Sequence, residues 1–158
     1  MARKNGKSDD SDEKKLNFKE LLKTQVQEFP EGKDLPTGTY RAKIAGAKPN
    51  EEKGFVGFAW QPLEAQDDVD SADLQAYIDS EGWDDARVFQ NAWVNKRRDV
   101  RDLLALLTRM GVQTVGRTFE ESIEASKGLE AFIEVIHKPR DDADGVYVNV
   151  RKVLPLEG

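Results

Sequence analysis

The sequence predicts a mainly β domain of five strands with helices placed between and before them. Five segments alternate apolar and polar residues with a period of two, which puts the apolar side chains on one face of a strand. A longer segment between the third and the fourth repeats apolar residues every three or four positions, as an amphipathic helix does. A second helical pattern precedes the first strand.

Two segments come before the strands. Residues 1–16 combine Gly, Ser and mixed charges with few apolar side chains, so we expect a disordered charged tail. Residues 17–30 repeat apolar side chains at helical spacing from Phe18 to Phe29, with Asn17 as the cap and Pro30 in the stop signal. This predicts an amphipathic helix that docks on its own domain or, alternatively, on a partner.

The first two strands are expected at 39–47 and 55–63, with a turn at 49–54 between them. Small residues, Gly57 and Ala59, occupy the outward face of the second strand. The inward faces consist of Tyr40, Ala42 and Ile44 in the first strand and Val56, Phe58 and Trp60 in the second.

An acidic insert follows at 64–85, with nine acids and no base. Asp70 and Asp73 can frame a short helix that holds Leu74, Tyr77 and Ile78 on one side. We expect the insert to be a solubilising loop, a surface that holds a partner, or a competitor of nucleic acid for a basic groove.

The third strand is expected at 86–95, with Val88, Ala92 and Val94 facing inward. The long helix at 96–110 comes next and ends at Gly111, and Thr118 with Glu121 can box a short helical turn. The last two strands are expected at 129–138 and 146–154. Five strands with a helix between the third and the fourth have the connectivity of an OB-fold barrel, here over residues 35–158.

Composition argues against most enzyme classes. The chain of 158 residues has no cysteine and a single histidine, His137, so thiolate metal sites, cysteine catalysis and multi-histidine sites are excluded. We expect no catalytic residue, no metal and no cofactor; a nuclease dependent on converging carboxylates is the weaker alternative. The longest uncharged run, Gly54–Leu63, is too short to span a bilayer, and no signal peptide is recognisable, so a cytoplasmic protein is expected.

The outward strand faces combine aromatic, amide and cationic side chains. Bases stack on aromatic rings and phosphates need nearby cations, so this mixture suits single-stranded nucleic acid. The alternative is that the N-terminal helix covers Phe89 and Trp93 as a second small core. The candidate strand residues are Arg41, Lys43, Phe55, Arg87, Phe89, Asn91, Trp93, Tyr147 and Arg151.

A basic run, Lys96, Arg97, Arg98 and Arg101, begins the long helix. Its cations oppose the helix dipole, whereas a phosphate at this terminus would be stabilised by cations and free amides together. Residues 87–117 hold seven bases and two acids, so the net charge of −6 hides a basic region beside the acidic insert.

The chain resembles a family of phage-encoded OB-fold single-stranded DNA-binding proteins over residues 35–154. The resemblance is carried by the segments Leu35–Tyr40, Gly54–Phe58, Phe89–Asn95, Leu106–Gly111 and Lys127–Leu129. It implies non-sequence-specific coating of single strands in phage DNA replication or recombination, in the host cytoplasm. By the same resemblance, Arg87, Phe89 and Trp93 would be strand-face contacts, and Lys96, Arg97 and Arg98 backbone contacts.

Many single-strand binders carry an acidic C-terminal tail that recruits replication proteins, whereas residues 154–158 carry one acid. We therefore expect the acidic insert to contact replication or recombination proteins, and a homo-oligomer is compatible with the sequence. The alternative function is an accessory protein whose OB fold binds another protein through the N-terminal helix and the acidic insert.

Overall fold

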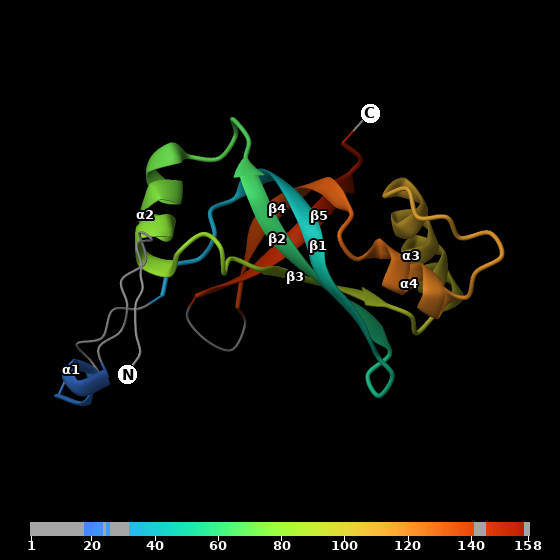
Figure 1. The fold of residues 1–158 in the computed structure, drawn as a ribbon, viewed down its shortest axis with the longest axis horizontal. Coiled ribbons are helices and arrows are strands. Elements are labelled where there is room, and N and C mark those ends of the chain that lie inside the picture. Colours follow the sequence, from blue (N-terminus) through green and yellow to red (C-terminus); the bar gives the residue numbers. More distant parts are fainter. Residues whose placement is uncertain (1–17, 24, 26–31, 141–144, 157–158) are drawn as a thin grey trace.

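A computed structural model of the chain describes residues 18–23, 25, 32–140 and 145–156 (Figure 1). The tail predicted at 1–16 lies outside the described residues. Of the helix predicted at 17–30, the structure describes α1, Phe18–Lys23. Phe18 and Leu22 in α1 are 68% and 70% exposed, so the described part of this helix does not dock on the domain.

Five strands form one antiparallel sheet in the order β3-β2-β1-β4-β5. Tyr40, Ala42 and Ile44 of β1 and Val56, Phe58 and Trp60 of β2 are all buried, as their alternation predicts. The strands are β1 Gly38–Asn50, β2 Phe55–Ala65, β3 Val88–Trp93, β4 Glu130–Pro139 and β5 Val146–Leu154. The prediction of a mainly β fold with five strands, and helices between the third and the fourth, is confirmed.

The sheet curls but is not closed into a barrel. Bulges interrupt β1 after Arg41 and after Ile44, and another interrupts the pairing of β4 with β5 after Glu134, which increases the local twist. The edge strands β3 and β5 approach within 8 Å between Cα atoms, yet no ladder of hydrogen bonds joins them in the described chain. The expected barrel therefore stays open at this seam.

Two helices cover one end of the sheet and a third covers the opposite end (Figure 1). The long helix α3, Arg97–Arg109, buries Leu103, Leu106 and Leu107. It is followed by α4, Phe119–Ser126, which the predicted box begins: the Glu121 N–H donates to Thr118 Oγ1 over 3.1 Å, and the Thr118 N–H donates to Glu121 Oε1 over 2.9 Å. The packing of α3 leaves a space between this helix and the edge strands β3 and β5.

The acidic insert is part of the core rather than a surface loop. It contains α2, Ser71–Glu81, whose Tyr77 is 9% exposed, and Val69 before it is 8% exposed. Leu74 and Ile78 pack against the same core, as their spacing predicts. Asp70 caps α2 by accepting a hydrogen bond from the Asp73 N–H over 2.9 Å. Because these apolar groups fill the end of the sheet, a purely solubilising role for the insert is excluded.

Across the described residues, no helix is both long and apolar enough for a membrane crossing.

Candidate nucleic-acid interface

The outward face of β3 carries two exposed aromatic rings. Val88 is 1% exposed, whereas Phe89 is 67% and Trp93 46% exposed, so the predicted alternation of this strand is confirmed. The described part of α1 leaves both rings open, and they form no second core. Exposed apolar surface that is grouped in this way is typical of a site that contacts a ligand or a partner.

The ring of Trp93 is held from one side by a neighbouring strand. Phe55 on β2 is directly opposite Trp93 in the register, and their ring centroids lie 5.0 Å apart at an interplanar angle of 65°. This edge-to-face contact is a favourable arrangement of two aromatic rings. It restrains Trp93 while leaving about half of its surface available to a ligand.

A first hollow of about 620 Å³ lies on the outer face of β1, β2 and β3. Its floor is made of small residues, Gly46, Gly57 and Ala59, and its walls include Phe55 and Phe89. A Cβ added to Gly57 would lie 3.5 Å from Phe55, so glycine is not required there by the backbone; it leaves space above the strand. The hollow is a mainly apolar slot with aromatic walls, which Lys48, Glu51 and Glu52 also line.

A second hollow of about 440 Å³ follows the open seam between β3 and β5. Phe89 and Trp93 line it from β3, Lys138 from β4, and Asn149 and Arg151 from β5. Arg151 occupies the bulge of β5, with Nε 3.4 Å from Glu134 Oε1. Cations therefore stand along the side of the seam that faces the aromatic rings.

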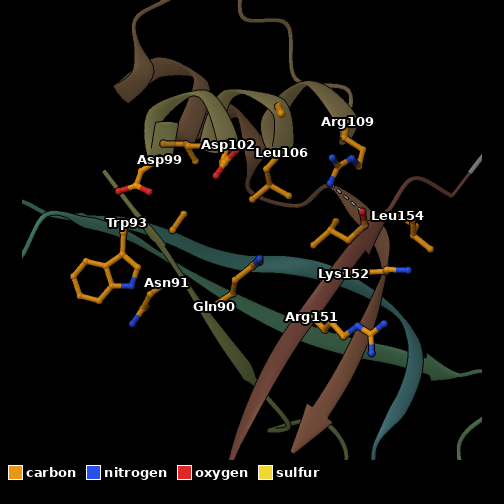
Figure 2. Close-up of a pocket in the computed structure, with 14 residues that line it drawn as sticks. Gln90, Asn91, Trp93, Asp99, Asp102, Leu106, Arg109, Arg151, Lys152 and Leu154 are labelled. Carbon is orange, nitrogen blue, oxygen red and sulfur yellow. Dashed lines mark hydrogen bonds between the residues drawn. The ribbon is translucent and has the colours of Figure 1, made fainter. Parts of the chain in front are cut away.

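A third hollow of about 720 Å³ lies between α3, β3 and the end of β5 (Figure 2). Asp99 and Asp102 enter it from the first turns of α3, and Arg109 enters it from the last. Arg151 and Lys152 contribute the opposite wall from β5 (Figure 2). This hollow is acidic at one end and basic at the other.

The three hollows adjoin β3 and share lining residues. Asn91 lines all three, Phe89 lines the first two, and Trp93 lines the last two. We call these three hollows together the β3 groove.

Five of the predicted site residues line the β3 groove. They are Phe55, Phe89, Asn91, Trp93 and Arg151. The others lie elsewhere: Lys43 is on β1 beyond the groove, and Tyr147 on β5 stacks under the Arg140 guanidinium at 4.9 Å from the ring centroid.

Two arginines predicted to bind nucleic acid form hydrogen bonds or ion pairs with other parts of the domain. Arg41 Nη1 donates to Glu130 Oε1 over 2.6 Å, and its Nε lies 3.7 Å from Glu64 Oε1. Arg87 Nη1 donates to the carbonyl oxygens of Asp84, over 3.0 Å, and of its own neighbour Ala86, over 2.8 Å. Both side chains are thereby held away from the three hollows.

The basic run at the start of α3 is exposed, but none of its four residues lines the groove. The side of the helix that faces β3 presents Asp99 and Asp102 instead. Asp99 also accepts a hydrogen bond from the N–H of Lys96, the N-cap residue of α3, over 3.2 Å. The four residues are Lys96, Arg97, Arg98 and Arg101.

Sequence reasoning missed several groove residues. Gln90 lies on the inward side of β3, where the buried Trp60 Nε1–H donates to its Oε1 over 2.9 Å, so alternation alone would have classed it with the core. Arg109 donates from Nη1 to the Val153 carbonyl oxygen over 3.4 Å, a contact between distant segments that no local pattern reveals. Other charged residues that it missed are Lys138, Asp99, Asp102 and Lys152, together with Lys48, Glu51 and Glu52 of the first hollow.

His137 has a structural contact. Its Nε2 lies 2.7 Å from the Leu35 carbonyl oxygen, and since a carbonyl only accepts, the ring donates there. Within the described ranges, no group of three or more His, Cys, Asp or Glu side chains is placed to hold a metal ion.

No model of a known protein family matches the chain, and no curated protein matches its sequence. The function is therefore inferred from the geometry of the β3 groove.

Proposed function

We propose that the protein is a non-enzymatic single-stranded DNA-binding protein with an OB fold. The observation that carries this proposal is the β3 groove itself, where exposed aromatic rings stand over a floor of small residues and cations line the far side. Stacking on rings and pairing of phosphates with cations are the two interactions that bind single strands without regard to sequence.

The strand order supports the OB fold. A sheet of five strands whose first strand pairs with both the second and the fourth, with helices between the third and the fourth, has the connectivity of a partly open Greek-key barrel. In that fold, oligonucleotides bind on the face of strands 2 and 3. The β3 groove lies on the corresponding face of this protein.

Within the groove, a bound DNA strand would run from the apolar slot, past Asn91, to the seam between β3 and β5. Phe89 and Trp93 offer faces for stacking, and Lys138 and Arg151 lie where the backbone would follow the seam. The net charge of −6 does not oppose this, since much of the acidic charge belongs to the insert at the opposite end of the sheet.

The cellular task we propose follows from the resemblance to phage-encoded single-stranded DNA-binding proteins: coating single strands during phage DNA replication or recombination, in the host cytoplasm.

The proposal is tested by titrating the full chain with oligothymidylate at low salt and following tryptophan fluorescence. Trp93→Ala removes the fluorescent ring of the groove, so its affinity is measured by retardation, and binding should weaken by about 1–3 kcal/mol, the contribution of one stacked base. The matched control is Phe119→Ala, because Phe119 is 45% exposed, close to the value for Trp93, but lies on α4 outside the groove. If wild type shows neither a fluorescence change nor retardation by the oligonucleotide, the proposed function is wrong.

A second candidate is a protein-binding accessory role for α1. The observation in its favour is that Phe18 and Leu22 are both more than two-thirds exposed on one short helix. Replacing both by Ser should leave oligonucleotide binding unchanged. If the same variant no longer captures replication or recombination proteins that the wild-type chain captures, the accessory role is supported.

A further inference from the structure

We infer that the third hollow of the β3 groove is a pocket for one base that carries an exocyclic amino group, guanine above all, so that binding is selective at a single position. This inference rests on the proposed function and adds a base preference to it. The other two hollows would remain indifferent to sequence.

The charges of the third hollow are separated along its length. Asp99 lies on the side of Trp93 and Asp102 lies further along α3, whereas Arg109 lies at the other end and Arg151 and Lys152 lie on the far wall (Figure 2). A pocket meant only for backbone phosphates would not be lined by two carboxylates. A nucleotide, in contrast, has hydrogen-bond donors on its base and negative charge on its phosphate, which matches both ends.

Asp102 is the residue best placed to read a base. The described chain offers it no hydrogen bond and no ion pair, whereas Asp99 already accepts from the Lys96 N–H. An ionised carboxylate only accepts hydrogen bonds, so it selects a ligand edge that donates. Carboxylates that read bases accept from amino groups in this way.

The bases differ in what they offer to such an acceptor. Guanine has two adjacent donors on its Watson–Crick edge, N1–H and the amino group, which match the two oxygens of one carboxylate. Adenine and cytosine offer the amino group alone. Thymine offers one N–H between two carbonyl oxygens, which would repel the carboxylate. In single strands these edges are free to be read.

The opposite end of the hollow suits the phosphate. Arg109 is fixed by its hydrogen bond to the Val153 carbonyl, and Lys152 follows Arg151 immediately after the bulge of β5. The volume of about 720 Å³ falls within the roughly 300–1,000 Å³ of small-molecule sites, a size suited to one nucleotide.

The test compares a ten-residue oligothymidylate with the same oligonucleotide carrying a single central guanine, titrated into the full chain. We expect the guanine to tighten binding by at least about fivefold. Hypoxanthine at that position, which lacks the amino group, should give an intermediate affinity.

The variant Asp102→Asn should abolish the preference while retaining binding of oligothymidylate. Asp73→Asn on α2 is the matched control, because it removes the same charge outside the groove and should keep the preference. Equal affinity of wild type for the two oligonucleotides, or an unchanged preference in Asp102→Asn, would overturn the inference and leave the proposed function standing. Absence of binding to both oligonucleotides would overturn the proposed function as well.

Discussion

The α2 end of the sheet and the β3 groove both hold charged and aromatic side chains, but they use them differently. At the α2 end, carboxylates are bonded into the fold. Asp68 accepts from the Thr39 N–H and from its hydroxyl, each over 2.8 Å, and Glu81 accepts from the Ser80 hydroxyl over 2.6 Å and the Lys33 N–H over 3.1 Å. These bonds hold the pKa values of Asp68 and Glu81 below their usual range.

The aromatic residues show the same difference. At the α2 end, Tyr40 is fully buried and its hydroxyl donates to the Pro36 carbonyl over 2.7 Å, and burial raises the pKa of Tyr77. In the β3 groove, Phe89 and Trp93 are exposed beside open space. Much of the acidic charge therefore belongs to the structural end, whereas the exposed aromatic rings lie on the face proposed to bind.

The largest expected effect is on the free energy of unfolding, which should depend on the α2 end and not on the exposed rings of the β3 groove. Tyr77→Ala should lower the free energy of unfolding by about 3 kcal/mol, because it empties part of the core. Phe89→Ala should change it by no more than about 0.5 kcal/mol, as for other surface substitutions. Urea denaturation followed by circular dichroism measures both, and equal decreases in the two variants would contradict the division.

Filling the apolar slot should affect binding alone. Gly57→Val adds a side chain whose Cβ meets only ordinary contacts, so the fold should be retained while the branch occupies the hollow. We expect oligothymidylate affinity to fall by about 1–2 kcal/mol, within the range for removal of one stacked base. The control is Gln61→Val, on the same face of β2 beyond the groove. Undiminished binding by Gly57→Val would remove the slot from the site.

Salt dependence distinguishes the cations of the groove from those of the basic run. Replacing Arg151 and Lys152 by Gln should reduce the log–log salt slope by about 0.7 for each phosphate that the protein no longer neutralises. The same change at Arg97 and Arg98, which do not line the groove, should reduce it less. A larger reduction from Arg97 and Arg98 would place the backbone contacts at the start of α3, as the sequence alone suggested.

The smallest expected effect is the pH dependence of the α2 end. Because hydrogen bonds from Thr39 lower the folded pKa of Asp68, this carboxylate stabilises the fold above its unfolded value of about 3.8 and loses that contribution as pH falls through the lower folded value. Thr39→Val should move the pKa of Asp68 back up. Carboxyl chemical shifts followed by NMR between pH 2 and pH 6, about the range in which Asp titrates, measure it; an unmoved titration would show that Thr39 is not the cause.

Much of the fold could be predicted from local patterns because a strand with one buried face must alternate. The inward residues of β1 and β2, the box of Thr118 with Glu121, and the helical side of Leu74, Tyr77 and Ile78 all follow this logic. The acidic insert was harder to interpret, because its charge suggests solvent whereas Val69, Leu74, Tyr77, Ile78 and Trp83 supply part of the core.

The candidate site was predictable only in part. Exposure of Phe89 and Trp93 follows from alternation in β3, and both line the groove. The opposite wall could not be foreseen, since Arg151 and Lys152 reach it through a bulge that changes which side chains face the seam. The basic run was predicted to contact phosphates from its charge, but helix rotation decides that Asp99 and Asp102 face the strands.

By itself, the sequence determined the five strands, the helix between the third and the fourth, and the absence of cysteine, because periodicity and composition are local properties. Only the tertiary structure decided that the sheet stays open between β3 and β5 and that residues of β3, α3 and β5 together line the third hollow. The physical reason is that the pairing of distant strands and the rotation of a packed helix depend on contacts between segments far apart in the chain, which no local pattern encodes.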